Sequence, residues 1–126
     1  MKLFFCGLVV VMLVHDQAAA FSTDTLRRHC KSYSDNDFQA SHPDHNICIS
    51  YVLGVLDTMN FNCIYSRLLS VDKEALAHLG SEATSKDLPF VIKQFLDKAG
   101  SNAHLSDKTA FLLLQEAAKA VEPCRQ

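Results

Sequence analysis

The sequence predicts an all-α domain, a small single-domain bundle of about five helices cross-linked by two disulfides. Four or five segments after residue 20 carry apolar residues at helical spacing, and no segment keeps the two-residue alternation of a half-buried strand. The 106 residues that follow residue 20 (126 − 20) suit one compact domain. An even set of cysteines in a small exported domain favours disulfides, and four follow residue 20: Cys30, Cys48, Cys63 and Cys124.

The N-terminal segment has the three parts of a secretory signal peptide. Lys2 precedes an apolar run from Leu3 to Val14, and small residues follow at Ala18 to Ala20. The run is shorter than the roughly 20 residues that a membrane-spanning helix needs. We therefore expect residues 1–20 to be a signal peptide cleaved near Ala20, and residues 21–126 to form the exported domain.

The first helix is predicted from about Ser22 to Ser32. Thr23 or Asp24 can cap its N-terminus, because short polar side chains accept hydrogen bonds from the first free N–H groups. Phe21, Leu26 and Cys30 then face inward. A polar stretch containing Pro43 follows and predicts a loop.

The second helix is predicted from about His45 to Asn60. It is apolar nearly all round, which is typical of a central, buried helix. The opposite side from its Cys48–Val52 face carries Gly54 and Asp57. A glycine there costs about 1 kcal/mol of helix propensity, so the sequence predicts that another helix packs closely against Gly54. Asp57 would then need a hydrogen-bond partner.

The middle of the chain, from Ile64 to Ser85, has a weaker pattern. Val71–Leu79 is predicted to be a short helix that ends at Gly80. The small, polar segment Gly80–Lys86 that follows predicts an exposed loop.

The last two helices have clear apolar stripes. One runs up to Gly100, with Ser85 or Asp87 as its cap and Pro89 in its first turn, where proline is tolerated. Its inward residues are Leu88, Val91, Ile92, Phe95, Leu96 and Ala99. The final helix begins near Ser106 and stops before Pro123. Its inward residues are Ala110, Phe111, Leu114, Ala118 and Val121.

Four cysteines allow three pairings, and helix order favours one of them. Consecutive helices in a bundle tend to run antiparallel, which brings Cys30 near Cys48 and leaves Cys63 for Cys124. In the loop-entropy model these bridges contribute about 3 and about 4 kcal/mol, because the second closes the longer loop.

The histidines near the second cysteine allow a zinc site as an alternative. His42, His45 and Cys48 lie at three-residue intervals, with His29 or Cys30 nearby. We favour oxidised cysteines and histidines on a polar surface, because export favours disulfides and the chain has no C-x-x-C pair. The sequence therefore predicts no metal and no other cofactor.

Catalytic patterns are missing from the sequence. It has no G-x-S-x-G, no H-E-x-x-H and no glycine-rich phosphate loop, and the spacing of Asp35, Asp37 and Asp44 implies no acid–base pair. A net charge of −2 and one small basic cluster do not favour nucleic acid. We therefore predict a non-catalytic binding protein, with an exported carrier or chaperone for a lipid, an apolar ligand or an unfolded client as the alternative.

Three features occur in an order that resembles a known family. They are Cys48-x-x-Tyr51-x-x-Gly54-x-x-Asp57, a cysteine (Cys30) at the end of the first helix, and a terminal Pro123-Cys124 after an apolar helix. Together with the export signal they resemble the Rap/Tai group of periplasmic immunity proteins. These proteins protect bacteria from cell-wall amidases that type VI secretion systems deliver.

The resemblance implies how the chain would act. It implies a homodimer and the non-catalytic inhibition of a papain-like peptidoglycan amidase, by occlusion of its active-site cleft. The protruding element that we expect to enter the cleft is the segment Gly80–Lys86, beside the short helix Val71–Leu79, with Glu82 and Lys86 supplying polar contacts. The candidate effector-binding residues are Gly80, Ser81, Glu82, Ala83, Thr84, Ser85 and Lys86. The helix that holds Gly54 is expected to be scaffold and not the inhibitory site.

Overall fold

The structure is a computed structural model that describes residues 21–34, 43–69, 73–101, 104 and 109–125. Within these ranges the secondary structure consists of five helices and two isolated bridges, with no strand. The all-α prediction is confirmed. The predicted signal peptide, residues 1–20, lies outside the described residues, as do Val71 of the predicted short helix, His42 of the zinc alternative and Ser106.

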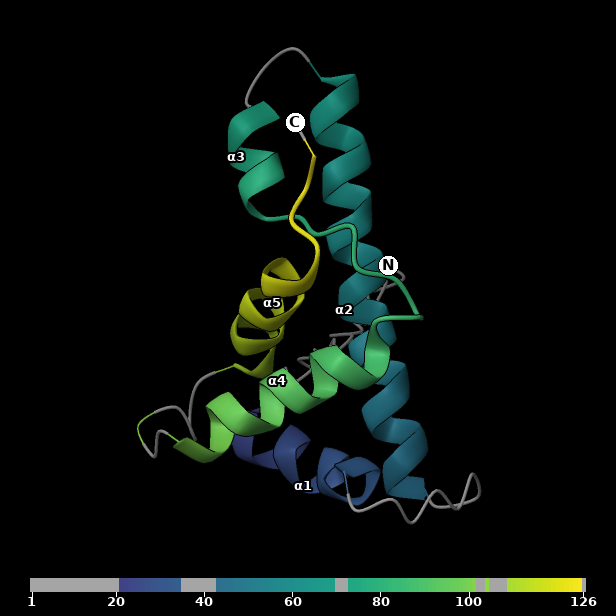
Figure 1. The fold of residues 1–126 in the computed structure, drawn as a ribbon, viewed down its shortest axis with the longest axis vertical. Helices are drawn as coiled ribbons and strands as arrows, with labels where there is room; N and C mark the ends of the chain where they lie inside the picture. Colours follow the sequence, from purple (N-terminus) through teal and green to yellow (C-terminus); the bar gives the residue numbers. More distant parts are fainter. Residues whose placement is uncertain (1–20, 35–42, 70–72, 102–103, 105–108, 126) are drawn as a thin grey trace, which may run out of the picture.

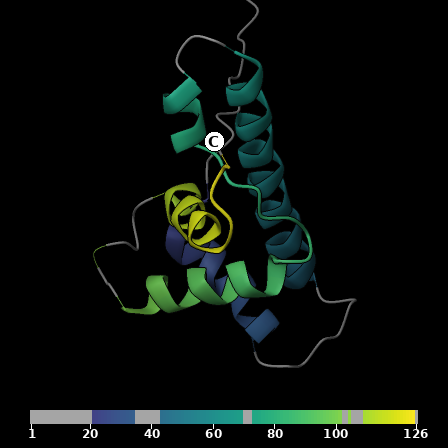
Figure 2. The ribbon, with the colours of Figure 1, turned by 45° about the horizontal axis from the view of Figure 1, so that its top comes forward.

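One long helix organises the bundle. Helix α2, Pro43–Leu68, has 26 residues and stands upright in Figure 1. Helices α1, Thr23–Ser34, and α4, Leu88–Ser101, cross its lower half. Helix α5, Ala110–Val121, lies against α4, and the short α3, Lys73–His78, lies beside the upper half of α2 (Figures 1 and 2).

The core lies where α1, α2, α4 and α5 meet. Phe95 of α4 is its largest fully buried side chain, and Leu26, Val52 and Leu114 reach 0% exposure from the other three helices. The predicted inward residues of α4 are buried except Leu96, which is half-buried, and the same holds for Phe111 and Val121 in α5. Helical periodicity therefore identified the core-facing sides of α4 and α5.

Helix boundaries differ from the predictions by a few residues. The hydroxyl of Ser22 accepts a hydrogen bond from the Thr25 N–H at 3.2 Å, so Ser22 caps α1, and Thr23 and Asp24 are already helical. Helix α5 begins at Ala110, later than expected, after an extended Thr109. The backbone N–H of Ala110 donates to the carbonyl of Phe21 at 2.9 Å, which joins this helix start to the start of α1.

The largest difference is the length of α2. The predicted helix ends at Asn60, whereas α2 continues to Leu68. By length and apolar composition α2 could cross a membrane, but the core helix of a soluble protein passes the same test. Cys48, Val52 and Met59 are fully buried, so one face of α2 forms part of the core of the bundle.

Gly54 and Asp57 do not have the environment that the sequence predicted. Both are exposed, and a Cβ added at Gly54 would meet nothing within 4 Å. Among the described residues no helix packs against the glycine, so the prediction of close packing was wrong. Asp57 faces solvent and needs no buried partner.

Both predicted disulfides are present. Cys30–Cys48 joins α1 to α2, and Cys63–Cys124 joins α2 to the segment after α5. The second bridge closes a sequence separation of 61 residues, against 18 for the first. Two disulfides in a small domain indicate an oxidising, exported environment.

Candidate functional site

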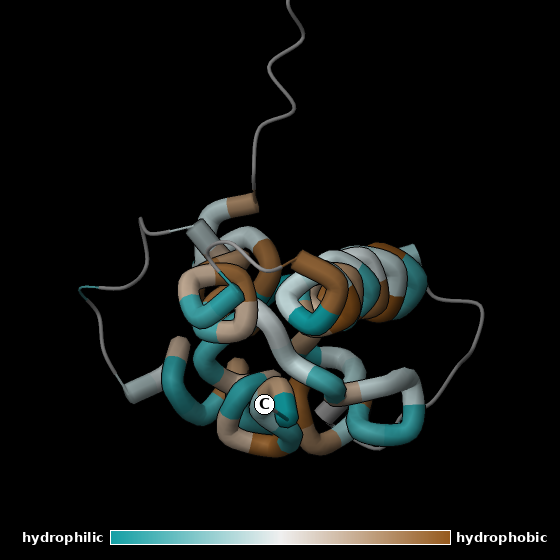
Figure 3. The backbone as a smooth tube through the Cα atoms, turned by 90° about the horizontal axis from the view of Figure 1, so that it is seen from above, coloured by the Kyte–Doolittle hydropathy of each residue, from teal (hydrophilic) through white to brown (hydrophobic). Residues whose placement is uncertain are grey.

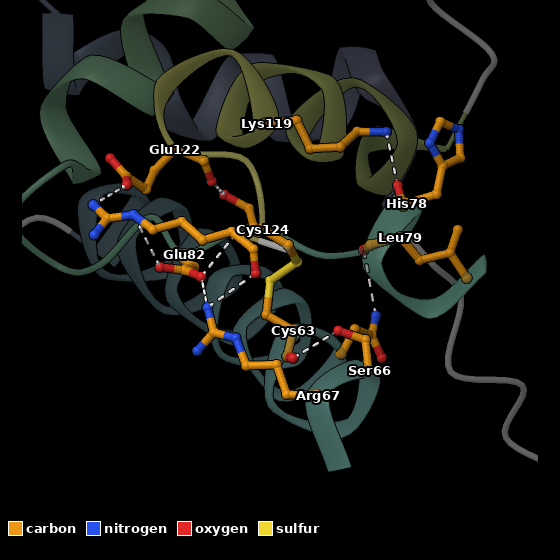
Figure 4. The surroundings of a disulfide bond; sticks show 12 residues. Cys63, Ser66, Arg67, His78, Leu79, Glu82, Lys119, Glu122 and Cys124 are labelled. Carbon is orange, nitrogen blue, oxygen red and sulfur yellow. Dashed lines mark hydrogen bonds and ion pairs between the residues drawn. A yellow bond between two sulfur atoms is a disulfide. The ribbon is translucent and has the colours of Figure 1, made fainter. Parts of the chain in front are cut away.

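The Cys63–Cys124 disulfide forms a junction between α2, the segment after α3 and the C-terminal segment (Figure 4). Gly80 packs directly on this disulfide. A Cβ added at Gly80 would lie 2.4 Å from the Cys124 sulfur, 2.6 Å from the Cys63 sulfur and 3.0 Å from the Met59 carbonyl oxygen. Only glycine fits at this position without movement of the disulfide or of the α2 backbone.

Ser81 continues the junction into the bundle. Its hydroxyl is fully buried and lies 2.6 Å from the carbonyl oxygen of Glu122 and 2.9 Å from that of Ala118. The same oxygen accepts a hydrogen bond from the Ala83 N–H at 3.1 Å. Ala118 lies in the last turn of α5 and Glu122 is its C-cap, so the Ser81 hydroxyl contacts the end of α5 beside the backbone hydrogen bonds that these carbonyls also accept.

Backbone hydrogen bonds hold the same segment on both sides. The Ser81 N–H donates to the Met59 carbonyl at 3.3 Å, and the Glu82 N–H donates to the Glu122 carbonyl at 2.9 Å. Ser81 and Pro123 form an isolated antiparallel bridge. The segment is therefore fixed between α2 and the chain that leaves α5.

The end of α3 is fixed by side chains of its neighbours. Lys119 Nζ donates to the carbonyl of His78 at 3.2 Å (Figure 4). The carbonyl of Leu79 accepts from Gln115 Nε2 at 3.0 Å and from Asn62 Nδ2 at 3.3 Å. Three side-chain donors from α2 and α5 thus satisfy the carbonyls that a helix C-terminus leaves unpaired.

Glu82 is the acidic centre of the junction. Its side chain is only 20% exposed and pairs with the guanidinium of Arg67 from α2. Its carboxylate also accepts from the Arg125 backbone N–H at 3.0 Å and lies 3.8 Å from the Arg125 guanidinium (Figure 4). Arg125 makes a further ion pair with Glu122 at 2.8 Å. These contacts connect α2, the 80–86 segment and the C-terminal segment.

The exposed end of the segment forms a compact turn. The carboxylate of Asp87 accepts from the Thr84 N–H at 2.8 Å and from the Thr84 hydroxyl at 3.1 Å. The Thr84 hydroxyl accepts from the Lys86 N–H at 3.3 Å, and the Asp87 N–H donates to the Thr84 carbonyl at 2.9 Å. This local network fixes the turn immediately before α4, in the way expected of Asp and Thr in turns.

The predicted contact residues therefore separate into two groups. Gly80, Ser81 and Ala83 are buried, so the prediction that the whole segment is exposed was wrong. The Glu82 carboxylate pairs with Arg67 and Arg125 of the same chain. Three predicted residues stay open to solvent, and we name them the 84–86 turn: Thr84, Ser85 and Lys86. The small residues of the segment serve close packing, which a sequence pattern of small and polar residues does not distinguish from a solvent-exposed loop.

A cleft lies beside the junction, between α2, α3 and the C-terminal segment. Its volume is about 280 Å³. The lining residues are Ser66, Arg67, Lys73, Glu74, Ala77 and Arg125. Two of its cationic groups, Arg67 and Arg125, are already paired with Glu82. Five of these six residues have polar or charged side chains, and Ala77 is the exception.

The zinc alternative does not agree with the structure, because Cys30 and Cys48 are joined to each other and neither sulfur is a free thiolate. His29 Nδ1 lies 2.9 Å from the Asp44 carboxylate, and His45 stacks on Tyr33. Over the described part of the chain, no group of three or more His, Cys, Asp or Glu side chains could hold a metal ion.

A second surface was missed by the sequence analysis. The part of α2 beyond the predicted helix end carries four exposed large apolar side chains, Phe61, Ile64, Tyr65 and Leu68, and the exposed Leu69 follows directly after the helix. The residues that face inward there, Cys63 and Ser66, are small. The usual pattern of large apolar residues inside is therefore inverted in the last two turns. The hydropathy colouring in Figure 3, a view from above along the upright α2, includes brown, apolar residues among those of this helix. The sequence did contain a signal for this extension of α2, because apolar residues continue at helical spacing beyond Asn60.

Comparisons with known proteins found no match to this chain. No family model matches it, and neither the curated proteins nor the solved structures contain a match. Fold and junction together define the class, a small helical domain cross-linked by two disulfides.

Proposed function

We propose that this protein is a periplasmic immunity protein, which binds a secreted peptidoglycan amidase and blocks its active-site cleft. The observation that carries the proposal is the construction of the 80–86 segment. Its first half is locked by Gly80 on the disulfide and by the buried Ser81 hydroxyl, while the 84–86 turn is exposed. Inhibitors that bind a cleft benefit from a rigid, exposed turn, because little entropy is lost on binding.

The choice of a peptidoglycan amidase as the partner rests on the resemblance to the Rap/Tai group. That resemblance is carried by the ordered residues Cys48, Tyr51, Gly54 and Asp57. The Cys63–Cys124 disulfide supports it physically, because it fixes the base of the turn in an oxidising compartment. A non-catalytic role suits a site whose charged groups pair with each other, as Glu82 does with Arg67 and Arg125.

The test is protection of cells in which an amidase acts on the periplasm. An amidase encoded beside this gene is targeted to the periplasm with and without the full chain, and lysis is followed by optical density. We expect the full chain to prevent lysis. Equal lysis in both cultures would reject the proposal for that pair.

Variants of the 84–86 turn locate the contact. Ser85→Trp places a large side chain on the turn and should abolish protection without unfolding the domain, because Ser85 is exposed. Ala120→Trp, at an exposed position of α5, is the matched control and should still protect. Full protection by Ser85→Trp would show that the turn does not enter the cleft.

The alternative function, a carrier or chaperone, is favoured by one observation. The exposed apolar residues at the end of α2 could bind an apolar ligand or an unfolded client. Saturable binding of a fluorescent fatty acid, in a protein that does not bind the amidase, would select this alternative.

A further inference from the structure

We propose that the Cys63–Cys124 disulfide is a site of thiol–disulfide exchange, at which a dithiol attacks the Cys124 sulfur and thereby unlocks the 80–86 segment. The dithiol is the reduced cysteine pair of a thiol–disulfide oxidoreductase. The exchange itself does not depend on the proposed function. Only its consequence for amidase binding rests on that function.

The two disulfides differ in their access to solvent. Cys30 and Cys48 are both 0% exposed, and they lie inside α1 and α2. Cys63 is 1% exposed, but Cys124 is half-buried and lies in the non-helical segment after α5. An attacking thiolate must reach a sulfur atom. The Cys30–Cys48 bridge therefore reacts only after α1 separates from α2, whereas Cys124 is accessible in the folded protein.

A depression of about 440 Å³ leads to Cys124. It lies between α3, α5 and the segment after α5, and this volume is in the range of pockets that admit small ligands. Ala77 of α3 and Gly80 lie on one side of it, and Pro123 and Cys124 lie on the other. Two of these residues have small side chains or none, so there is room for a thiol to approach Cys124.

The charges around the depression do not exclude a thiolate. Lys119 and Glu74 both line it, with one charge of each sign. Lys119 Nζ donates to the neutral carbonyl of His78 at 3.2 Å, and among the described residues no carboxylate pairs with this ammonium group. A cation that keeps its charge stabilises a thiolate close to it.

Exchange at Cys124 proceeds in two steps. The first thiolate of the dithiol forms a bond to Cys124 Sγ, the Cys124–Cys63 bond breaks, and Cys63 leaves as a thiolate that takes a proton from water. The second thiolate of the dithiol then attacks its own partner sulfur, which releases Cys124 as a thiolate that is also protonated. The dithiol ends as a disulfide, and two electrons have passed to Cys63 and Cys124, which end as thiols.

Reduction removes the anchor of the junction. Within the described chain this bridge is the one cross-link between α2 and the segment after α5, and Gly80 packs on its two sulfurs. The pair between Glu82 and the Arg125 guanidinium remains, at 3.8 Å, but the Arg125 side chain is 77% exposed and such pairs contribute little. The Cys30–Cys48 bridge still joins α1 to α2. We therefore expect the reduced protein to stay folded with a loosened 80–86 segment.

The primary experiment compares the two bridges within one native molecule. The full chain, purified from the periplasm, is treated with dithiothreitol as the probe dithiol, quenched with iodoacetamide and mapped by mass spectrometry. Cys63 and Cys124 should become alkylated at least about tenfold faster than Cys30 and Cys48. In concentrated urea the difference should disappear, because it arises from the fold. Circular dichroism of the singly bridged form should show retained helix and a lower melting temperature.

A second experiment identifies the sulfur that is attacked. Reduced glutathione has one thiol and cannot complete the second step, so it leaves a mixed disulfide that acid quenching preserves. We expect this mixed disulfide on Cys124 and the free thiol on Cys63, because Cys63 is 1% exposed.

A third experiment blocks the depression. Ala77→Trp places a large side chain in its lining and should slow reduction of Cys63–Cys124 severalfold. Ala75→Trp is the matched control, because Ala75 is exposed on the same short helix and lies outside this lining. It should leave the rate unchanged. Thermal melts verify that both variants are folded.

The consequence for function is measured separately, by inhibition of the amidase. The Cys63→Ala, Cys124→Ala variant lacks the bridge without added groups and should inhibit several times more weakly than the intact chain. Inhibition equal to that of the intact chain would show that the bridge does not control the 80–86 segment.

Three results would overturn the exchange itself. They are equal rates for the two bridges in the native protein, glutathione on Cys63 in place of Cys124, or the same rate in Ala77→Trp as in Ala75→Trp. All three are measured without an amidase, so the exchange and the proposed function succeed or fail separately.

Discussion

Two glycines show how differently the two ends of the bundle are built. Gly80 lies against the Cys63–Cys124 disulfide, where an added Cβ would approach a sulfur to 2.4 Å. Gly54 lies in the middle of α2, where the same Cβ would meet nothing within 4 Å. The helix-propensity cost at Gly54 therefore has no compensation inside this chain, whereas the glycine at the junction is required by packing.

This comparison changes the meaning of the motif that contains Gly54. A glycine inside an apolar helix usually indicates close approach of another backbone. Here the space beside it is open, because Gly54 is exposed on the side of α2 away from the core. Close packing within the chain occurs instead in a segment that looks like an ordinary polar loop. The predictions below test this contrast, from the largest expected effect to the smallest.

Removing the disulfide at the junction should have the largest effect. The double variant Cys63→Ala with Cys124→Ala should lower the free energy of unfolding by about 2–5 kcal/mol, since the bridge closes the longer of the two loops. Urea denaturation followed by circular dichroism measures the change. A loss no greater than that from Cys30→Ala with Cys48→Ala would contradict the expectation from loop length.

Adding one methyl group at Gly80 should have the next largest effect. Gly80→Ala should destabilise the domain by about 1–3 kcal/mol, because the disulfide or the α2 backbone must move. The control is the same substitution in the Cys63→Ala, Cys124→Ala background. There the sulfurs are gone and the cost should fall. An equal cost in both backgrounds would mean that the disulfide does not set the need for glycine.

Loss of the Ser81 hydroxyl should cost about 1–3 kcal/mol. Ser81→Ala leaves the buried Ala83 N–H without its acceptor, and an unpaired buried polar group is costly, whereas the carbonyls of Ala118 and Glu122 keep their backbone donors. Denaturant melts measure it against Ser85→Ala, an exposed position in the same segment, which should stay within about 0.5 kcal/mol of wild type.

Neutralising Glu82 should have a smaller effect. Glu82→Gln weakens the pairs with Arg67 and Arg125 and should cost about 1 kcal/mol, since the carboxylate is largely shielded from solvent. Asp97→Asn is the control, because the Lys93–Asp97 pair on α4 is exposed and should contribute almost nothing. Equal changes in melting temperature for both variants would show that Glu82 is only a surface charge.

Gly54→Ala should have the smallest effect, and of opposite sign. With open space for the methyl group, the variant should stabilise the domain by about 0.5–1 kcal/mol through helix propensity. Thermal melts followed by circular dichroism measure the change. The sequence had suggested that a larger residue at Gly54 lowers the melting temperature, and the open space reverses this expectation. Destabilisation by Gly54→Ala would show that something does pack there.

The sequence by itself determined the fold class, the number of helices and the disulfide pairing. These features follow from local information: periodic apolar residues such as Val91, Ile92 and Phe95 define a helix face, and helix order places Cys30 near Cys48. Helix caps were less certain, because Ser22, Thr23 and Asp24 are all good caps and only the geometry selects Ser22.

Tertiary structure alone decided which small and polar residues are buried. Ser81 and Gly80 are distant in sequence from Glu122 and Cys63, and nothing local shows that they will meet. The same holds for the environment of Gly54, because one face of a helix that is apolar all round can face the core or solvent. Hydrophobic periodicity and the number of cysteines can be read directly from the sequence. Burial, in contrast, depends on contacts between segments that lie far apart in the chain.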